Sequence, residues 1–283
     1  MFWAISLGCR TIAHGTEFIE GGFMLPENLK TVNGLLLDLN GVFYVGNRLL
    51  PGAQKAIAAL QKSGLPYRYV TNNTTQSTQS MSQSLEAMGL AIAPSEVITA
   101  AYAAVMHLRQ LGSPKIYPLI AADAKQDFAE FTWSDSEADV VVIGDIGDDW
   151  NYHLMNRAFR LLMKGAQLIA LHRGKYWQWE AGLQLDVGAF VAGLEYATDQ
   201  VAIVAGKPNP FFYKMALDDL GLPAEQVVMM GDDLEADVKG AQNAGTKGVL
   251  IKTGKYRPHL AAKLGVTPDG ELENIGKIID WLS

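Results

Sequence analysis

The stretch Leu35-Leu36-Leu37-Asp38-Leu39-Asn40-Gly41 decides the fold class of this chain. A short, continuous apolar run predicts a strand that is buried on both faces, as in a parallel sheet. Gly41 allows the chain to turn where that strand ends. Asp38 then lies at the carboxyl end of a buried strand, where open α/β sheets place their ligand crevice. A carboxylate there needs a cation or hydrogen-bond donors, because burying an unpaired charge is costly.

The composition indicates a chain with a sizeable core. Its 283 residues are 49% hydrophobic, which is enough for one large domain or two smaller ones. The net charge of −7 argues against nucleic-acid and anionic-membrane partners. No apolar run approaches the roughly 20 residues of a spanning helix, so we expect no membrane segment. The single cysteine, Cys9, excludes an intrachain disulfide framework and favours a reducing, cytoplasmic compartment.

Strand-like and helix-like segments alternate along the chain, which predicts βαβ units and a doubly wound parallel sheet. Helices are expected at 53–63, 78–88, 101–111, 125–131, 152–163, 189–197, 211–220, 235–244 and 275–282. Further strands are expected at 67–70, 97–99, 115–120, 140–143, 167–171, 201–204, 227–230 and 248–251, and an irregular stretch at 173–185. We expect a core domain of 25–103 and 201–283, an inserted α/β domain of 104–200, and a flexible arm of 1–24.

Three later segments repeat the pattern seen at Asp38, with apolar residues first and polar residues at the end of the strand. They are Thr71-Asn72-Asn73, Lys207 after Gly206, and Asp232-Asp233 with Asp237. Because parallel strands bring their carboxyl ends to one edge, we expect these side chains to converge. Two carboxylates can bind Mg²⁺ through oxygen, and a lysine and a threonine hydroxyl can hold a phosphoryl group. A carboxylate beside a metal and a lysine is a candidate nucleophile, forming an aspartyl-phosphate.

Each segment alone also has an ordinary explanation. Thr71-Asn72-Asn73 suits a helix N-cap, Lys207 could be a surface lysine, and Asp232-Asp233 could begin an acidic helix. The occurrence of all the segments in one chain favours the functional interpretation. A further acidic group, Asp145, Asp148 and Asp149, is interpreted as a loop and helix cap rather than a second metal site.

The segments Asp38-Leu39-Asn40-Gly41, Thr71-Asn72-Asn73, Gly206-Lys207-Pro208 and Gly231-Asp232-Asp233-Leu234-Glu235-Ala236-Asp237 resemble the motifs of the haloacid dehalogenase superfamily of phosphohydrolases. The resemblance covers 25–283 and is strongest to the branch with a large α/β cap between the second and third motifs. That branch includes the phospholysine phosphohistidine inorganic pyrophosphate phosphatase and hydrolase-domain-containing relatives. The resemblance therefore implies a doubly wound core with an inserted cap, a small phosphorylated substrate, and possible homodimers formed through the cap.

The resemblance also implies roles for the site residues. Asp38 would be the nucleophile, and Thr71, Asn72, Asn73 and Lys207 would hold the phosphoryl group. Mg²⁺ would be bound by Asp38, Asp232 and the backbone carbonyl of Asn40, with Asp233 and Asp237 in support.

One position departs from the family pattern. Most phosphatases of the superfamily carry a second aspartate where this chain has Asn40. That acid protonates the leaving group and later activates water, and an amide does neither. We therefore expect slow turnover and a preference for P–O–P or P–N substrates over alkyl phosphates. The alternatives are a broad phosphomonoesterase acting on nucleotides or sugar phosphates, and a phosphate- or metal-binding protein with little turnover.

The basic and aromatic loop after the predicted strand 167–171 has two open interpretations. It contains His172, Arg173, Lys175, Tyr176 and Trp177. It is either an exposed loop with local packing or a cap loop that recognises the leaving group.

Overall fold

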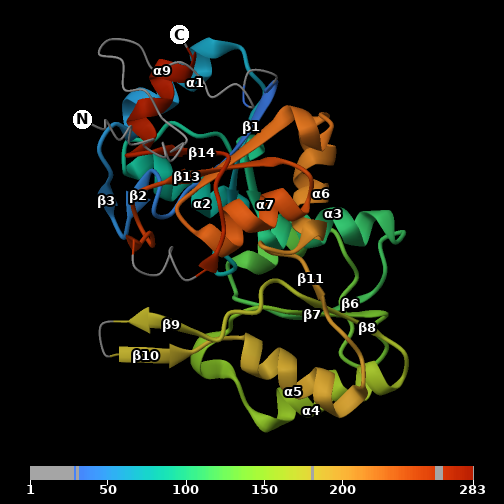
Figure 1. Ribbon diagram of the computed structural model, residues 1–283. Coiled ribbons are helices and arrows are strands. Elements are labelled where there is room, and N and C mark those ends of the chain that lie inside the picture. Colours follow the sequence, from blue (N-terminus) through green and yellow to red (C-terminus); the bar gives the residue numbers. More distant parts are fainter. Residues whose placement is uncertain (1–28, 30–31, 180–181, 259–263, 283) are drawn as a thin grey trace, which may run out of the picture.

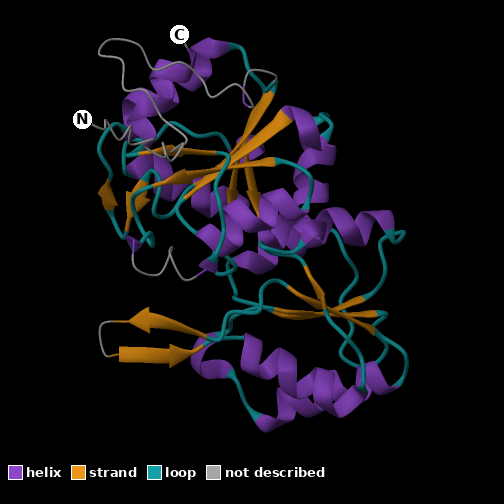
Figure 2. Ribbon diagram, in the orientation of Figure 1, coloured by secondary structure: helices purple, strands orange, loops and turns teal. Residues whose placement is uncertain are grey.

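The computed structural model describes residues 29, 32–179, 182–258 and 264–282. The predicted arm at 1–24 lies outside these ranges. Two parallel sheets form two stacked units (Figure 1), and helices cover both faces of each (Figure 2). None of the helices in the described ranges combines the length and the apolar character that crossing a membrane requires.

The core sheet has six strands in the order β14-β13-β12-β1-β4-β5, and every neighbouring pair is parallel. Its strands are β1 (Gly34–Asp38), β4 (Tyr67–Thr71), β5 (Val97–Thr99), β12 (Val227–Gly231), β13 (Lys247–Ile251) and β14 (Gly270–Leu272). The predicted doubly wound parallel sheet is confirmed. The initial strand β1 lies between β12 and β4, so residues far apart in sequence end at the same edge.

The burial of β1 explains its uninterrupted apolar sequence. Leu35 and Leu37 pack on one face of the sheet, with α1 (Ala53–Ser63) and α2 (Thr78–Ala87). Leu36 packs on the opposite face, with α6 (Pro210–Leu220). Side chains alternate along a strand, so only a strand covered on both faces requires an apolar residue at every position.

The second sheet contains β6 (Ile116–Leu119), β7 (Val140–Ile143), β8 (Gln167–Ala170) and β11 (Ile203–Val204), in the order β11-β8-β7-β6, all parallel. Helices α4 (Tyr152–Met163) and α5 (Gly188–Thr198) cover one face. Helix α3 (Ala100–Gln110) packs on the other face through Ala104 and Leu108, while its Ala103 faces the core sheet. This helix therefore packs against both units.

Several predicted elements differ in the structure. Predicted helix 125–131 is the 3₁₀ segment η3 (Ala124–Phe128), and predicted helix 235–244 is a π-helical turn, η6 (Leu234–Lys239), followed by α7 (Gly240–Asn243). The closing helix is divided into the 3₁₀ segment η7 (Ile275–Ile278) and α9 (Ile279–Leu282). Within 173–185, an antiparallel hairpin forms from β9 (Tyr176–Trp179) and β10 (Gly182–Leu185) instead of an irregular stretch.

Three further strands and one boundary were not anticipated. The edge strand β14 and the small hairpin of β2 (Tyr44–Val45) and β3 (Arg48–Leu49) are too short to give a periodic signal. Strand β11 was expected in the core, but it pairs with β8 and so belongs to the second sheet. The short 3₁₀ segments η2 (Pro94–Glu96), η4 (Gly147–Asp149) and η5 (Ala224–Gln226) complete the described elements.

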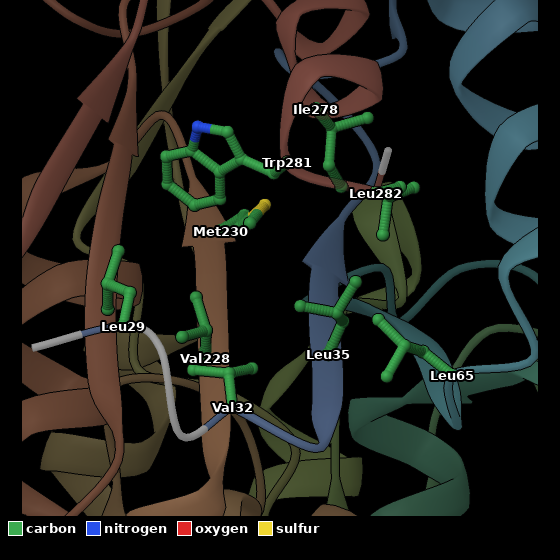
Figure 3. A pocket seen from close by; sticks show the side chains of 9 residues that line it. All are labelled: Leu29, Val32, Leu35, Leu65, Val228, Met230, Ile278, Trp281 and Leu282. Atoms are coloured by element: carbon green, nitrogen blue, oxygen red, sulfur yellow. The ribbon is translucent and has the colours of Figure 1, made fainter. Parts of the chain in front are cut away.

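An apolar cavity of about 90 Å³ lies between the core sheet and α9. Figure 3 shows its lining, which consists of Leu29, Val32, Leu35, Leu65, Val228, Met230, Ile278, Trp281 and Leu282. It contains no charged side chain, so it offers nothing to hold an anion or a metal ion. A second cavity, lined by charged side chains, lies at the carboxyl edge of the same sheet.

Candidate active site

A cavity of about 230 Å³ lies where the carboxyl ends of β1, β4 and β12 meet. Its lining includes every candidate residue from the four sequence segments: Asp38, Asn40, Thr71, Asn72, Asn73, Lys207, Asp232, Asp233 and Asp237. The structure adds Tyr44, Ala236 and Lys255. The parallel sheet therefore brings together polar groups that the sequence separates by up to about 200 positions.

The ammonium group of Lys207 lies at the centre of this cavity. Its Nζ donates to Asp38 Oδ1 at 2.5 Å and to Asp237 Oδ1 at 2.7 Å, and the side chain is only 3% exposed. Burial alone would lower the pKa of Lys207, but the carboxylates of Asp237 and Asp38 outweigh that effect and raise it. The lysine therefore stays charged and fixes the direction of both carboxylates.

The backbone of Lys207 is fixed from both units. In the second sheet, Ala205 N donates to Ala170 O at 2.8 Å, which continues the pairing of β11 with β8. In the core, Asn72 accepts from Lys207 N and donates to Lys207 O, both at 2.8 Å. The Asn72 side chain thus orients the lysine rather than standing free in the cavity.

Asp232 is held by the close approach of two loops. Its Oδ2 accepts from Lys255 N at 2.5 Å, and its side chain is buried. A Cβ atom on Gly41 or Gly254, both at positive φ, would lie 2.1 Å or 2.0 Å from this same oxygen. Only glycine allows the backbone to pass so close to the carboxylate, so these glycines define the position of Asp232.

Asp233 and Asp237 are positioned by the π-helical turn η6. Asp233 accepts from Glu235 N and Ala236 N as its N-cap, as the alternative interpretation of an acidic helix start expected. Asp237 Oδ2 accepts from Asp233 N at 3.1 Å, so both oxygens of Asp237 have hydrogen-bond partners. π-helical turns often occur at functional sites, and here the turn directs Asp237 at Lys207.

Asp38, Asp232 and Asp237 form a cluster in which one oxygen from each lies within 4.8 Å of the others. Burial and the charge of Asp237 raise the pKa of Asp232 to about 6, and burial with the charge of Asp38 raises the pKa of Asp237 to about 6. Burial and the charge of Asp232 also raise the pKa of Asp38, even though Lys207 opposes them. Buried oxygen donors that repel one another fit a hard divalent cation such as Mg²⁺.

The loop after β4 makes mostly local hydrogen bonds. Thr71 Oγ1 accepts from Asn73 N at 3.2 Å, and Asn73 Oδ1 accepts from Thr75 N and Gln76 N at 3.0 Å. Thr71 is buried at the cavity wall, and its hydroxyl hydrogen remains to be donated. The loop is therefore a rigid wall beside Asp38.

The predicted cap loop lies elsewhere. His172 Nε2 is 2.9 Å from Asp186 Oδ1, and Arg173 donates to Glu195 at 2.7 Å, so both side chains make contacts within the second unit. Within the part of the chain that the structure describes, His172, Arg173 and Lys175 are not in the lining of the cavity that holds Asp38. The bond between His172 and Asp186 joins the two ends of the segment that carries the β9–β10 hairpin.

Lys255 and Tyr44 line the cavity but were not among the predicted site residues. Lys255 follows β13 and Gly254, so it obeys the same pattern of polar residues after a strand and could have been found by it. Tyr44 lies in the short β2 strand, for which the sequence gives no signal. Asp145 accepts from Gly147 N at 2.8 Å, in agreement with its interpretation as a loop residue.

Comparisons with known proteins show the family to which the chain belongs. Residues 35–134 match the family model described as haloacid dehalogenase-like hydrolase, and residues 204–278 match a model described as HAD-hydrolase-like. Haloacid dehalogenase-like hydrolase domain-containing protein 2 of Bos taurus is 38% identical over 255 residues, covering 89% of this chain and 96% of that protein. The phospholysine phosphohistidine inorganic pyrophosphate phosphatase of Homo sapiens is 37% identical over 262 residues, covering 90% and 96%.

The fold comparison points the same way. The solved structure of the 4-nitrophenylphosphatase from Thermotoga maritima superimposes with a TM-score of 0.83 at 28% identity, covering 91% of this chain and all of that one. The resemblance inferred from the motifs is thus confirmed across both sheets. On the motifs, the fold and these relatives together, the chain belongs to the haloacid dehalogenase-like hydrolase family and is one of its phosphatases.

Proposed function

We propose that the protein is a Mg²⁺-dependent phosphatase that forms an aspartyl-phosphate at Asp38 and favours P–O–P or P–N bonds. The observation that carries this proposal is the position of Asp38. Its Oδ1 is bound by Lys207 Nζ at 2.5 Å, which leaves Oδ2 as the attacking atom in a cavity shared with Asp232. A carboxylate oriented by an ammonium group is an effective nucleophile toward phosphorus.

The reaction follows as two displacements. Asp38 Oδ2 bonds to phosphorus while the bond from phosphorus to the leaving group breaks, and the leaving group takes that electron pair. Water then attacks the phosphorus of the aspartyl-phosphate, its proton passes to phosphate or solvent, and the Asp38 carboxylate is restored. Lys207 Nζ and Thr71 Oγ1 bind the phosphoryl oxygens and so stabilise the charge that develops on them.

The carboxylate cluster supports the metal requirement. Asp38, Asp232 and the backbone carbonyl of Asn40 would hold Mg²⁺, with Asp233 and Asp237 orienting the lysine and the loop. Bound Mg²⁺ would offset the negative charge of the carboxylates and of the phosphoryl oxygens.

Asn40 supports the choice of substrate class. Its amide has no proton to give to an alkoxide leaving group, so leaving groups that depart without a new proton are favoured. Pyrophosphate and protonated phosphoramidates meet this condition, and the human relative is named for such substrates. The alternatives are a broad phosphomonoesterase, in keeping with the name of the 4-nitrophenylphosphatase neighbour, and a binding protein with low turnover.

The second sheet and its helices would act as an inserted cap that excludes water from the cavity. We place this unit at about 104–200 and extend it to include β11 at 203–204. The core then comprises 25–103 and the residues after 204. A homodimer formed through the cap is part of the same proposal, since Tyr152 and Tyr196 on the outer helices α4 and α5 are exposed.

The test is hydrolysis by purified protein with Mg²⁺ against pyrophosphate, N-phospholysine, glucose 6-phosphate and AMP, with Asp38→Asn as the inactive control. We expect pyrophosphate or N-phospholysine to be hydrolysed fastest, and acid quenching to trap phosphate covalently on the wild-type protein alone. Faster hydrolysis of glucose 6-phosphate would reject the substrate class. Equal turnover by Asp38→Asn would reject the aspartyl-phosphate.

A further inference from the structure

We propose that Lys255 binds the leaving group of the substrate and selects leaving groups that carry negative charge. This inference rests on the proposed function. It narrows the substrate class to compounds such as pyrophosphate, in which a second phosphoryl group departs with negative charge, and it disfavours N-phospholysine, whose leaving group departs as a neutral amine.

The first observation is that the backbone of Lys255 is fixed relative to the catalytic carboxylates. Lys255 N donates to Asp232 Oδ2 at 2.5 Å, and Thr253 Oγ1 donates to Gly41 O at 2.5 Å. A Cβ atom on Gly254 would lie 2.5 Å from Gly41 Cα, so the loop is in close contact with the turn after Asp38. The backbone of Lys255 is therefore held at a fixed position relative to Asp232 and the turn after Asp38.

The second observation is the contrast between the two lysines of the cavity. The Lys207 side chain is 3% exposed and its Nζ is bound by two carboxylates. The Lys255 side chain is 73% exposed, and its Nζ donates to Asp233 Oδ2 at 3.1 Å. Asp233 also accepts from two backbone N–H groups, so its position does not depend on Lys255. Lys255 can therefore turn toward a ligand without loss of the helix cap.

The third observation concerns charge. The cavity contains four carboxylates, those of Asp38, Asp232, Asp233 and Asp237, and two lysines. Lys207 is committed to the buried end, where the reacting phosphoryl group meets Asp38. Lys255 is the exposed lysine of the lining, so it lies at the end from which the leaving group extends. The ammonium group of Lys255 is largely exposed and pairs with Asp233, so it is a cation at neutral pH.

The ammonium group of Lys255 can stabilise the negative charge that develops on the leaving group. Asn40 cannot donate a proton, so the leaving group departs with its electron pair and gains negative charge. An ammonium group at its oxygen stabilises that charge as the bond breaks, by a charge-assisted hydrogen bond. For pyrophosphate the departing group is phosphate, which Lys255 attracts. For N-phospholysine the bridging nitrogen is already protonated and departs as a neutral amine, so it gains no negative charge for Lys255 to stabilise, and its positive charge before cleavage is repelled by Lys255.

The experiment compares Lys255→Met with Lys252→Met, a matched control in the same segment. Lys252 pairs with Glu271 and Glu273, and among the described residues it is not part of the cavity lining. We expect Lys255→Met to raise KM for pyrophosphate and lower kcat/KM about tenfold, since a charge-assisted hydrogen bond is lost. The kcat/KM for N-phospholysine should stay constant or rise. Lys255→Arg should restore pyrophosphate hydrolysis, and Lys252→Met should change neither substrate.

A binding measurement separates this inference from the proposed function. Calorimetry with the Mg²⁺-loaded protein compares methylene diphosphonate, a pyrophosphate analogue with an uncleavable bridge, with inorganic phosphate. Loss of the diphosphonate preference in Lys255→Met supports the inference even if no substrate is hydrolysed. Retention of that preference, or an equal loss of kcat/KM for both substrates in Lys255→Met, would overturn it.

Discussion

Lys207 Nζ and Asp38 Oδ1 lie 2.5 Å apart although 169 positions separate the two residues in sequence. The pair joins the strand that begins the core sheet to the segment that follows the last strand of the second sheet. Because the side chains are 3% and 10% exposed, water does little to screen the interaction. The pair is therefore a buried ion pair that fixes the segment leaving the second sheet against β1.

Replacing Lys207 should affect stability and activity together. Lys207→Met leaves the buried carboxylates of Asp38 and Asp237 without their cation, which should cost about 3 kcal/mol of unfolding free energy. Phosphatase activity should fall at least about 100-fold, because the phosphoryl group loses its charged donor. Chemical denaturation and steady-state kinetics measure the two effects.

A double variant separates the two effects of this lysine. Lys207→Met combined with Asp237→Asn removes one of the uncompensated charges, so it should regain part of the lost stability without regaining activity. Recovery of activity in the double variant would show that Lys207 acts only by neutralising Asp237.

The carboxylate cluster predicts how the stability of the metal-free protein depends on pH. The pKa values of Asp232 and Asp237 are raised to about 6 from an ordinary value of 3.8. Raised carboxyl pKa values stabilise the fold at low pH, and this contribution is lost as pH rises through about 6. Without metal, the melting temperature should therefore be higher near pH 5 than at pH 7.5, within the range where the rest of the fold is stable.

Mg²⁺ should reverse that trend, because the cation and protons compete for the same oxygens. The rise in melting temperature on adding Mg²⁺ should be larger at pH 7.5 than at pH 5. Asp232→Asn should stabilise the metal-free protein at pH 7.5 by on the order of 2 kcal/mol and abolish the Mg²⁺ response. Thermal unfolding with and without EDTA measures this, and an unchanged Mg²⁺ response in Asp232→Asn would contradict the assignment.

Asn40→Asp should restore the missing acid. Its carboxyl group can donate a proton to an alkoxide, so turnover of glucose 6-phosphate should rise about 100-fold or more. Pyrophosphate should change little, because its leaving group needs no new proton. Asn40→Ala is the matched control and should give no gain with either substrate. A gain with pyrophosphate equal to that with glucose 6-phosphate would mean that protonation is not what limits alkyl phosphates.

The contact between η3 and α2 should contribute to stability. Asp127 accepts from Thr78 N and from Thr78 Oγ1, both at 3.0 Å, so a carboxylate of the second unit binds the first turn of a core helix. Asp127→Ala should cost about 1 kcal/mol. Asp218→Ala is the control, since Asp218 makes only an exposed pair with Lys214 in the described structure. Denaturation curves of the two variants that coincide would contradict this role.

The fold and the polar segments could be predicted because each is a local signal with one physical cause. Leu35, Leu36 and Leu37 read as a doubly buried strand, and the polar residues after each strand mark one edge of the sheet. Strand β14 has three residues and lies at the edge, so periodicity cannot identify it. The π-helical turn at 234–239 depends on contacts of Asp233 and Asp237 that only the folded chain forms.

Side-chain contacts of the candidate site were the least predictable part. The sequence could not show that Asn72 binds the backbone of Lys207, or that His172 binds Asp186, since both partners are distant in sequence. Lys255 was not predicted as a site residue, although the run 252–257 resembles the same family branch and the residues after β13 follow the same strand-end pattern.

The pairing of β11 with β8 has a consequence for anyone who would engineer this chain by exchanging its inserted unit. The second sheet ends at Val204, and Lys207 follows three residues later. If the junction is made near 201, β11 stays with the core, and the exchanged unit lacks its edge strand. A splice made after 204 would join the foreign sheet directly to the backbone that aims the lysine. Any such chimera should therefore carry 203–207 as one block, together with Asn72, whose side chain hydrogen-bonds to the backbone of Lys207.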